Sequence, residues 1–336
     1  MSKTNTSTWI KLIVGAIILL IIPKFVPNSY IMTIIINIMI YVILAMGLNL
    51  LTGFTGILSL GHAAFFGIGA YTAAILNTRF HLQFPITVLA AIVVTLAMSL
   101  LLSIPSLRVK GTYLVLMTIG FGEVVRLLLQ NWRSLTGGPN GIVGISSPNF
   151  YLFKLTNAYQ YYYLVLFFIV ILQLYLRTLM KSRVGRCLLA IRDDDRAAEM
   201  VGIDIAQYKI KAFGISAIYC AIAGTLYAHT IQFVDPNSFR ADESQLILCC
   251  VIIGGIGTFA GPIVGAILLQ TIPELFRGLE SWRLVLYGVI LMITIIFFPG
   301  GIAKYAGLAI EKVKGLLGFG GKETGPGAKT PEGGGS

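Results

Sequence analysis

The chain has 336 residues, of which 56% are hydrophobic and only 12% are charged, whereas an ordinary soluble domain carries about 25% charged residues. So few charges cannot cover the surface of a soluble protein of this length, and we expect lipid to cover much of it. The net charge of +11 would suggest nucleic-acid binding in a soluble protein. Here the basic residues lie mostly between apolar runs, which is typical of membrane topology and argues against a nucleic-acid partner.

Ten apolar segments are candidates for membrane-spanning helices, because a crossing needs about 20 mainly apolar residues. The first follows two lysines, as in a signal peptide, but it has no small-residue cleavage pattern and is interpreted as an uncleaved span. The eighth and ninth are short and glycine-rich, so either could be a re-entrant segment. The segments lie at about 9–26, 30–52, 57–78, 84–104, 111–130, 160–178, 209–231, 243–256, 262–276 and 283–299.

The distribution of basic residues indicates the orientation of the chain. With the N-terminus in the cytoplasm and ten alternating spans, 17 of the 25 Lys and Arg residues fall on the inside. The positive-inside rule therefore predicts a multi-pass protein with both termini cytoplasmic. We expect residues 1–310 to form one all-α membrane domain, and we interpret the glycine-rich segment 315–336 as a disordered tail or a fusion scar.

The four cysteines and the glycine-rich strings indicate no chemistry of their own. The cysteines lack the spacing of a metal site or a disulfide framework and are interpreted as small packing residues. No G-x4-G-K-[ST] loop for ATP phosphates occurs in the sequence. The chain is therefore expected to bind no cofactor or metal, and any ATP that drives it must be hydrolysed by partner subunits.

The inside loop at about 182–206 holds most of the polar residues of the chain. Within it, residues 197–201 (AAEMV) favour a short helix and Gly202 is a natural terminator. Such a helix is suited to a groove in a partner protein, although a solvated loop that only fixes topology is an equal alternative. Ala197, Ala198 and Gly202 have the spacing of the coupling loop of ABC-importer permeases, but Arg196 stands where those permeases have glutamate.

Five longer strings resemble the branched-chain amino-acid ABC permease family, LivM-type inner-membrane subunit. They run in order across nearly the whole membrane part, at 48–71 (LNLLTGFTG and SLGHAAFFGIGAY), 134–141 (SLTGGPNG), 183–186 (RVGR), 254–258 (GGIGT) and 298–302 (FPGGI). The resemblance implies an ABC-importer permease fold in a bacterial inner membrane.

The same resemblance implies the partners and the role of the loop. The partners would be a homologous second permease, two cytoplasmic ATPase subunits and an extracytoplasmic substrate-binding protein. Alternating access would then move branched-chain or related neutral amino acids, although urea and short-chain amide importers share the family. The residues expected to couple to the ATPases are Gly185, Arg186, Ala197, Ala198, Glu199 and Gly202.

Four polar residues within spans are candidates for the translocation path, because a charge at the membrane centre costs about 2.5–3.5 kcal/mol on insertion scales. Glu123 either lines the route or pairs with Arg126 one turn on, and we favour the pair. His62 is more often a satisfied structural group than a transport residue. Asn49 and Ser59 could form hydrogen bonds across helices, which is the commonest structural role of such residues.

Gly257, Gly261 and Gly265 recur every fourth residue and are expected to form one stripe on a helix, unless Pro262 breaks the helix; small residues at this spacing let helices pack closely. Two other function classes remain open at this stage. An ion-coupled secondary transporter could use Glu123 or His62 as its ion site. An integral-membrane enzyme is a poor alternative, because the sequence has no paired carboxylates, metal cluster or nucleophile elbow.

Overall fold

The computed structural model describes residues 28–109, 111–150, 153–155 and 157–275, together with the single positions 23, 288, 289, 292, 301 and 302. Apart from these single positions, the predicted first span, the tenth span and the tail lie outside the described residues. Eleven α-helices lie within the described part, and the remaining elements are two short 3-10 turns and four two-residue strands. The expected all-α membrane architecture is confirmed.

Five of the helices are long and apolar enough to cross a membrane. They are α2 (Ser29–Thr55), α4 (Phe84–Ser106), α5 (Thr112–Asn131), α7 (Ala158–Lys181) and α10 (Ile205–Ile231). Three further predicted spans also coincide with helices, namely α3 (His62–Phe80), α11 (Ala241–Gly254) and α12 (Gly261–Leu275). Helix α11 has only 14 residues and ends at a C-cap on Gly255, which fits the expectation of a short or re-entrant segment.

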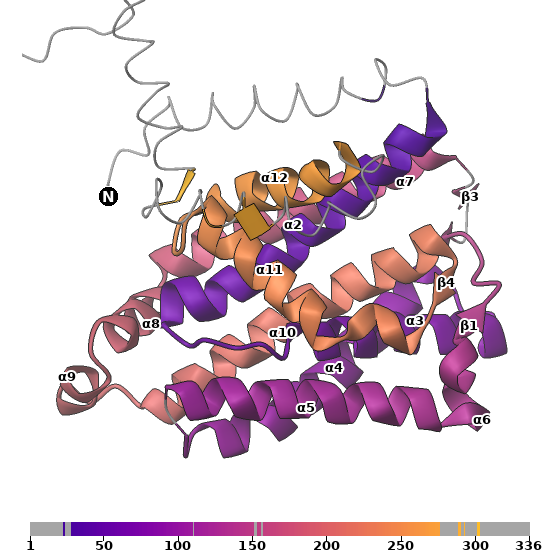
Figure 1. The fold of residues 1–336 in the computed structure, drawn as a ribbon. Coiled ribbons are helices and arrows are strands. Elements are labelled where there is room, and N and C mark those ends of the chain that lie inside the picture. The colour runs from indigo at the N-terminus through magenta and orange to yellow at the C-terminus, as the bar shows by residue number, and fades with distance from the viewer. Residues whose placement is uncertain are drawn as a thin grey trace, which may run out of the picture.

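The connections gather at two opposite ends of the bundle (Figure 1). One end holds α6 (Arg133–Thr136), the 3-10 turn η1 (Gly138–Asn140), and strand β1 (Ile142–Val143) paired antiparallel with β4 (Phe233–Val234). The short hairpin of β2 (Asn149–Phe150) and β3 (Phe153–Lys154) belongs to the same connection. The other end holds α8 (Arg183–Asp193) and α9 (Asp195–Met200), and α9 projects farthest from the bundle. This arrangement agrees with spans that alternate in direction.

Helix α2 is closed at both ends. Asn28 caps its start by accepting a hydrogen bond from the Tyr30 amide (2.9 Å). Gly56 ends it in a left-handed conformation (φ 75°), and the Gly56 N–H bonds back to the Leu51 carbonyl. The third span was expected from residue 57 but begins at His62. Residues 56–61 are therefore not helical, and Ser59 lies in a connection rather than in a membrane helix.

Helices α3 and α11 both begin inside the bundle. The Ala63 amide, in the first turn of α3, donates to the hydroxyl of Ser244 in the first turn of α11 (2.9 Å). Phe239, in the 3-10 turn η2 (Pro236–Phe239) just before α11, stacks edge-on against Phe66 of α3 with centroids 5.0 Å apart. The chain after α10 thus folds back into the bundle before α11 begins.

The core lies where α10 crosses α3 and α2. An added Cβ at Gly69 of α3 would come within 2.8 Å of the Ala221 Cα in α10. One at Gly224 of α10 would collide with the carbonyl oxygen of Phe66. These two glycines let the backbones of α3 and α10 approach closely, which is how helices associate in lipid.

Candidate functional site

The corner between α7 and α8 sets the position of the loop helices. Ser182 is the N-cap of α8 and accepts a hydrogen bond from the Gly185 amide (3.4 Å). Gly185 is buried, and an added Cβ would collide with the backbone of Leu179 and Met180. The structure therefore makes Gly185 a packing residue that aims α8, whereas the neighbouring Arg186 is exposed.

Helix α9 is the short helix that the sequence predicts before Gly202. The Asp194 carboxylate accepts hydrogen bonds from the amides of Arg196 (2.8 Å) and Ala197 (3.2 Å), as an N-cap does. These hydrogen bonds, the one from Ala197 most and the one from Arg196 next, lower the pKa of the Asp194 carboxyl below its ordinary value, and the carboxyl is charged at neutral pH. Gly202 ends the segment with φ 80°, where another residue would be strained.

The exposed face of α9 differs from the face that the sequence suggested. Ala198 is 3% exposed and packs against its own chain, so its side chain is not available to a partner, whereas Ala197 and Glu199 are exposed. The most exposed apolar side chains of the loop are Met200 (88%) and Val201 (76%). Sequence reasoning missed them as contact residues, although two apolar residues before a terminating glycine in a polar loop are a usable signal.

Two polar contacts hold α8 and α9 to the bundle. The Arg192 guanidinium donates to the Gly53 carbonyl at the end of α2 (2.8 Å), where a cation is favoured at a helix C-terminus. Lys209 of α10 forms a salt bridge with Asp195 of α9 (2.9 Å), and both side chains are partly covered. Movement of α8 and α9 is thereby linked to α2 and α10.

The turn between α11 and α12 lies against the same end of α2. Asn49 accepts from the Gly257 amide (2.8 Å) and donates to the Thr258 carbonyl (2.9 Å). An added Cβ at Gly257 would be 3.0 Å from both the Arg192 guanidinium and the Gly53 carbonyl oxygen. Asn49 is fully buried and joins helix to turn, so the structure gives it the interhelical role that the sequence left open.

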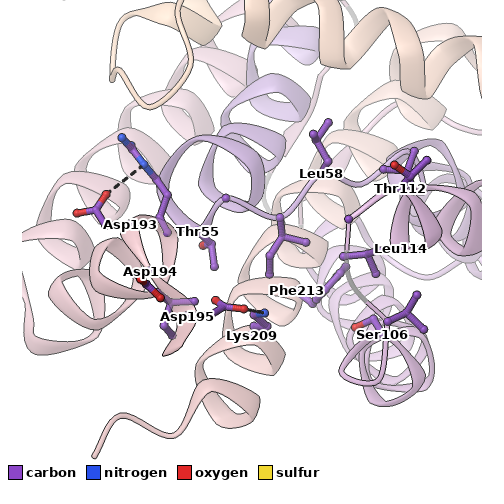
Figure 2. Close-up of a pocket in the computed structure, with 17 residues that line it drawn as sticks. Thr55, Leu58, Ser106, Thr112, Leu114, Asp193, Asp194, Asp195, Lys209 and Phe213 are labelled. Atoms are coloured by element: carbon purple, nitrogen blue, oxygen red, sulfur yellow. Dashed lines mark hydrogen bonds and ion pairs between the residues drawn. The ribbon is translucent and has the colours of Figure 1, made fainter. Parts of the chain in front are cut away.

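A cavity of about 510 Å³ opens between the loop helices and the bundle (Figure 2). On the loop side it is lined by Asp193, Asp194 and Asp195, and on the bundle side by residues that include Leu58 and Leu114. The bundle side is mixed, because Thr55, Ser106 and Lys209 also line it. The cavity leaves space beside α8 and α9 for movement or for a contacting chain.

Glu123 and Arg126 form the ion pair that the sequence favoured. The Arg126 Nε lies 3.0 and 2.9 Å from the two carboxylate oxygens of Glu123, and its Nη1 donates to Gln130 (2.8 Å). The Glu123 side chain is nonetheless 44% exposed and the Arg126 side chain 15% exposed. The pair is thus formed within α5 but open on one side.

His62 and Ser59 are fully buried. The His62 Nε2 lies 2.7 Å from the Ser216 hydroxyl, which itself donates to the Gly47 carbonyl (2.8 Å). Because the Ser216 hydroxyl donates to Gly47, it accepts from His62, which places the imidazole proton on Nε2. These two hydrogen bonds join α3, α10 and α2. Ser59 accepts from the Gly61 amide (3.3 Å) in the connection before α3, which is a local structural role.

The predicted glycine stripe is wrong in one of its three members. Helix α12 begins at Gly261, and Gly257 lies in the preceding turn with φ 72°, because Pro262 favours the first turn of a helix rather than its interior. Gly265 is on α12, and an added Cβ there would collide with the Cys250 carbonyl of α11. Gly261 likewise packs against the Gly255 carbonyl.

A bundle of apolar helices, five of them long enough to cross a membrane, defines a polytopic membrane protein. A family model described as "Branched-chain amino acid transport system / permease component" matches residues 30–298. The chain belongs to this family, and it is a transport permease rather than an enzyme.

Curated relatives agree with this assignment. The chain is 36% identical over 287 residues to the high-affinity branched-chain amino acid transport system permease protein LivM of Salmonella typhimurium, covering 79% of this chain and 68% of the relative. It is 37% identical to LivM of Escherichia coli with the same coverage. The autoinducer 2 import system permease protein LsrC of Yersinia enterocolitica is 29% identical over 57% of this chain and 53% of the relative. No solved structure matches the chain.

Proposed function

We propose that the chain forms the membrane path for branched-chain amino acids in an importer whose ATPase subunits dock on α9. The substrate assignment is supported by the two LivM relatives, which are more similar over more of the chain than LsrC is. The other partners in this proposal are a homologous second permease and an extracytoplasmic binding protein. The end that carries α8 and α9 faces the cytoplasm of a bacterial cell, which agrees with the excess of basic residues there.

The exposed apolar tip of α9 is the observation that carries the proposal. Met200 and Val201 stand on the element that projects farthest from the bundle, and exposed apolar side chains on a short helix suit a groove in a partner. Asp195 of α9 is paired with Lys209 of α10. Arg192 of the preceding helix α8 donates to the Gly53 carbonyl of α2 and lies beside Gly257, in the turn between α11 and α12. A force on the tip would therefore reach α10 directly and α2 through α8.

An ion-coupled secondary transporter finds less support in these contacts. The Glu123 carboxylate already bonds a guanidinium, and the His62 imidazole already bonds Ser216. Each group therefore already has one hydrogen-bond partner within the described residues. Urea and short-chain amides stay open as alternative substrates of the same kind of permease.

Charged substitutions at the tip test the docking contact. Met200→Asp and Val201→Asp place a carboxylate in an interface that we propose to be apolar, so the affinity for the ATPase subunits should fall about tenfold or more. The measurement is co-purification of the ATPases with tagged permease. Val143→Asp, on an equally exposed valine at the opposite end (70%), is the matched control and should retain them. Equal recovery of ATPases with all three variants would show that α9 is not the docking element.

A further inference from the structure

Helix α5 is the least covered of the five long apolar helices. Only 17% of its most apolar stretch is buried within the chain, compared with 72% for α10. Its open side carries exposed apolar residues, among them Leu116 (60%) and Val124 (56%). In Figure 1, α5 lies along one edge of the bundle.

The same open side carries the Glu123–Arg126 pair near the middle of the helix. Ionised groups at such a depth face a protein interior or a water-filled cavity rather than lipid. Since the described residues leave almost half of the Glu123 side chain uncovered, something beyond them must meet the pair. Water or a solute on a transport route can solvate the exposed side of the pair, and so can a second subunit that covers it.

The surroundings of the pair leave room for a small molecule. Gly120 and Gly122 directly precede it on α5, and a Cβ added to either glycine would meet no neighbouring atom within 4 Å. Arg240, the residue before α11, lies within electrostatic range of the Glu123 carboxylate. The Arg240 guanidinium is 4.0 Å from Asp242, and both of these side chains are exposed.

We propose that Glu123 and Arg126 form a binding site for the zwitterion of an α-amino acid, with its ammonium on Glu123 and its carboxylate on Arg126. Arg240 supports the carboxylate, and an apolar substrate side chain lies along the exposed aliphatic residues of α5. This inference rests on the proposed function, because it concerns the route through the permease.

A zwitterion is the ligand that this pair can accept without a net change of charge. A zwitterion carries one ammonium and one carboxylate. Glu123 can therefore pair with the ammonium and Arg126 with the carboxylate in place of each other, and no charge is left without a partner in a region of low dielectric. An uncharged solute would have to leave the resident pair intact and could bind only to its rim. The pair thus provides selection for the amino acid backbone, while the apolar surface of α5 tolerates different aliphatic side chains.

Thiol labelling of Gly122→Cys in the assembled complex tests this site. The glycine has open space for the new side chain, and the native cysteines are replaced beforehand. The complex is reconstituted in nanodiscs, a water-soluble charged thiol reagent is added, and the labelling rate is measured with and without millimolar leucine. The same measurement is made with Glu123→Gln and Arg126→Gln present together. Val143→Cys, at an exposed position of β1 outside α5, is the control.

We expect Gly122→Cys to react, leucine to slow the reaction about tenfold, and the paired amide substitutions to abolish this protection, because each removes a charge-assisted hydrogen bond. Labelling of Val143→Cys should not respond to leucine. Failure of Gly122→Cys to react, or protection that persists without the charges, would overturn the site. Leucine uptake by the parent complex is measured alongside: uptake without protection rejects the site alone, whereas absence of uptake rejects the proposed function as well.

Discussion

Asn49 joins helix α2 to the turn between α11 and α12 through a single side chain. Replacing it with leucine, which has a similar volume, leaves the Gly257 amide and the Thr258 carbonyl without these bonds. Each buried polar group without a partner costs about 1–3 kcal/mol, so Asn49→Leu should lower the thermal unfolding temperature of the purified complex. Asn37→Leu on the same helix is the control, since the Asn37 side-chain oxygen makes no hydrogen bond within the described residues. Equal unfolding temperatures for the two variants would show that the hydrogen bonds of Asn49 do not stabilise the contact between α2 and the turn.

Two glycines of helix α10 should respond in opposite ways to the same added methyl group. Gly224→Ala would collide with the Phe66 carbonyl of α3, whereas the methyl of Gly214→Ala would meet only Leu96 at an ordinary 3.4 Å. Alanine is favoured over glycine in a helix by about 1 kcal/mol. We therefore expect Gly214→Ala to be neutral or stabilising and Gly224→Ala to destabilise, as measured by thermal unfolding in detergent. Stabilisation by both would show that the two helices do not approach as closely as the structure places them.

At the scale of elements, helix α9 depends on its N-cap. Asp194→Ala removes the acceptor for the amides of Arg196 and Ala197, so this short helix should fray and its loop should become more susceptible to limited proteolysis. Asp194→Asn keeps an oxygen that can cap the helix and should behave like the parent. Amino acid transported per ATP hydrolysed should fall for the alanine variant only. If the alanine variant is cut more rapidly but transports as much amino acid per ATP as the parent, a well-ordered α9 is not needed for coupling.

The elements show what the sequence could and could not predict. Apolar length alone located the helices from α2 to α12 that lie in the membrane part, because hydrocarbon requires about 20 apolar residues whatever their order. It could not place Gly257 in a turn or Ala198 against its own chain, since both depend on contacts with residues distant in sequence. The Glu123–Arg126 pair was predictable because the two residues are three apart on one helix. The bond from Arg192 to Gly53 was not, because 139 residues separate them.

At the scale of the whole molecule, the alternation of spans predicts which end faces which side. Val143 and Met200 are exposed residues at opposite ends of the bundle. In a background without cysteines, Val143→Cys should react with a membrane-impermeant thiol reagent added to intact spheroplasts, and Met200→Cys should react only after the membrane is opened. The reverse pattern would invert the orientation and place α9 where no cytoplasmic ATPase could reach it.

The central claim is that this chain moves amino acids only as part of an ATP-driven assembly. The most direct measurement is uptake of radiolabelled leucine into proteoliposomes that contain the chain with its second permease and ATPases, together with loaded binding protein. We predict uptake that requires ATP and ceases when the phosphate-binding lysine of the ATPases is substituted. Leucine uptake by this chain alone, driven by an imposed proton or sodium gradient without ATP, would contradict the account.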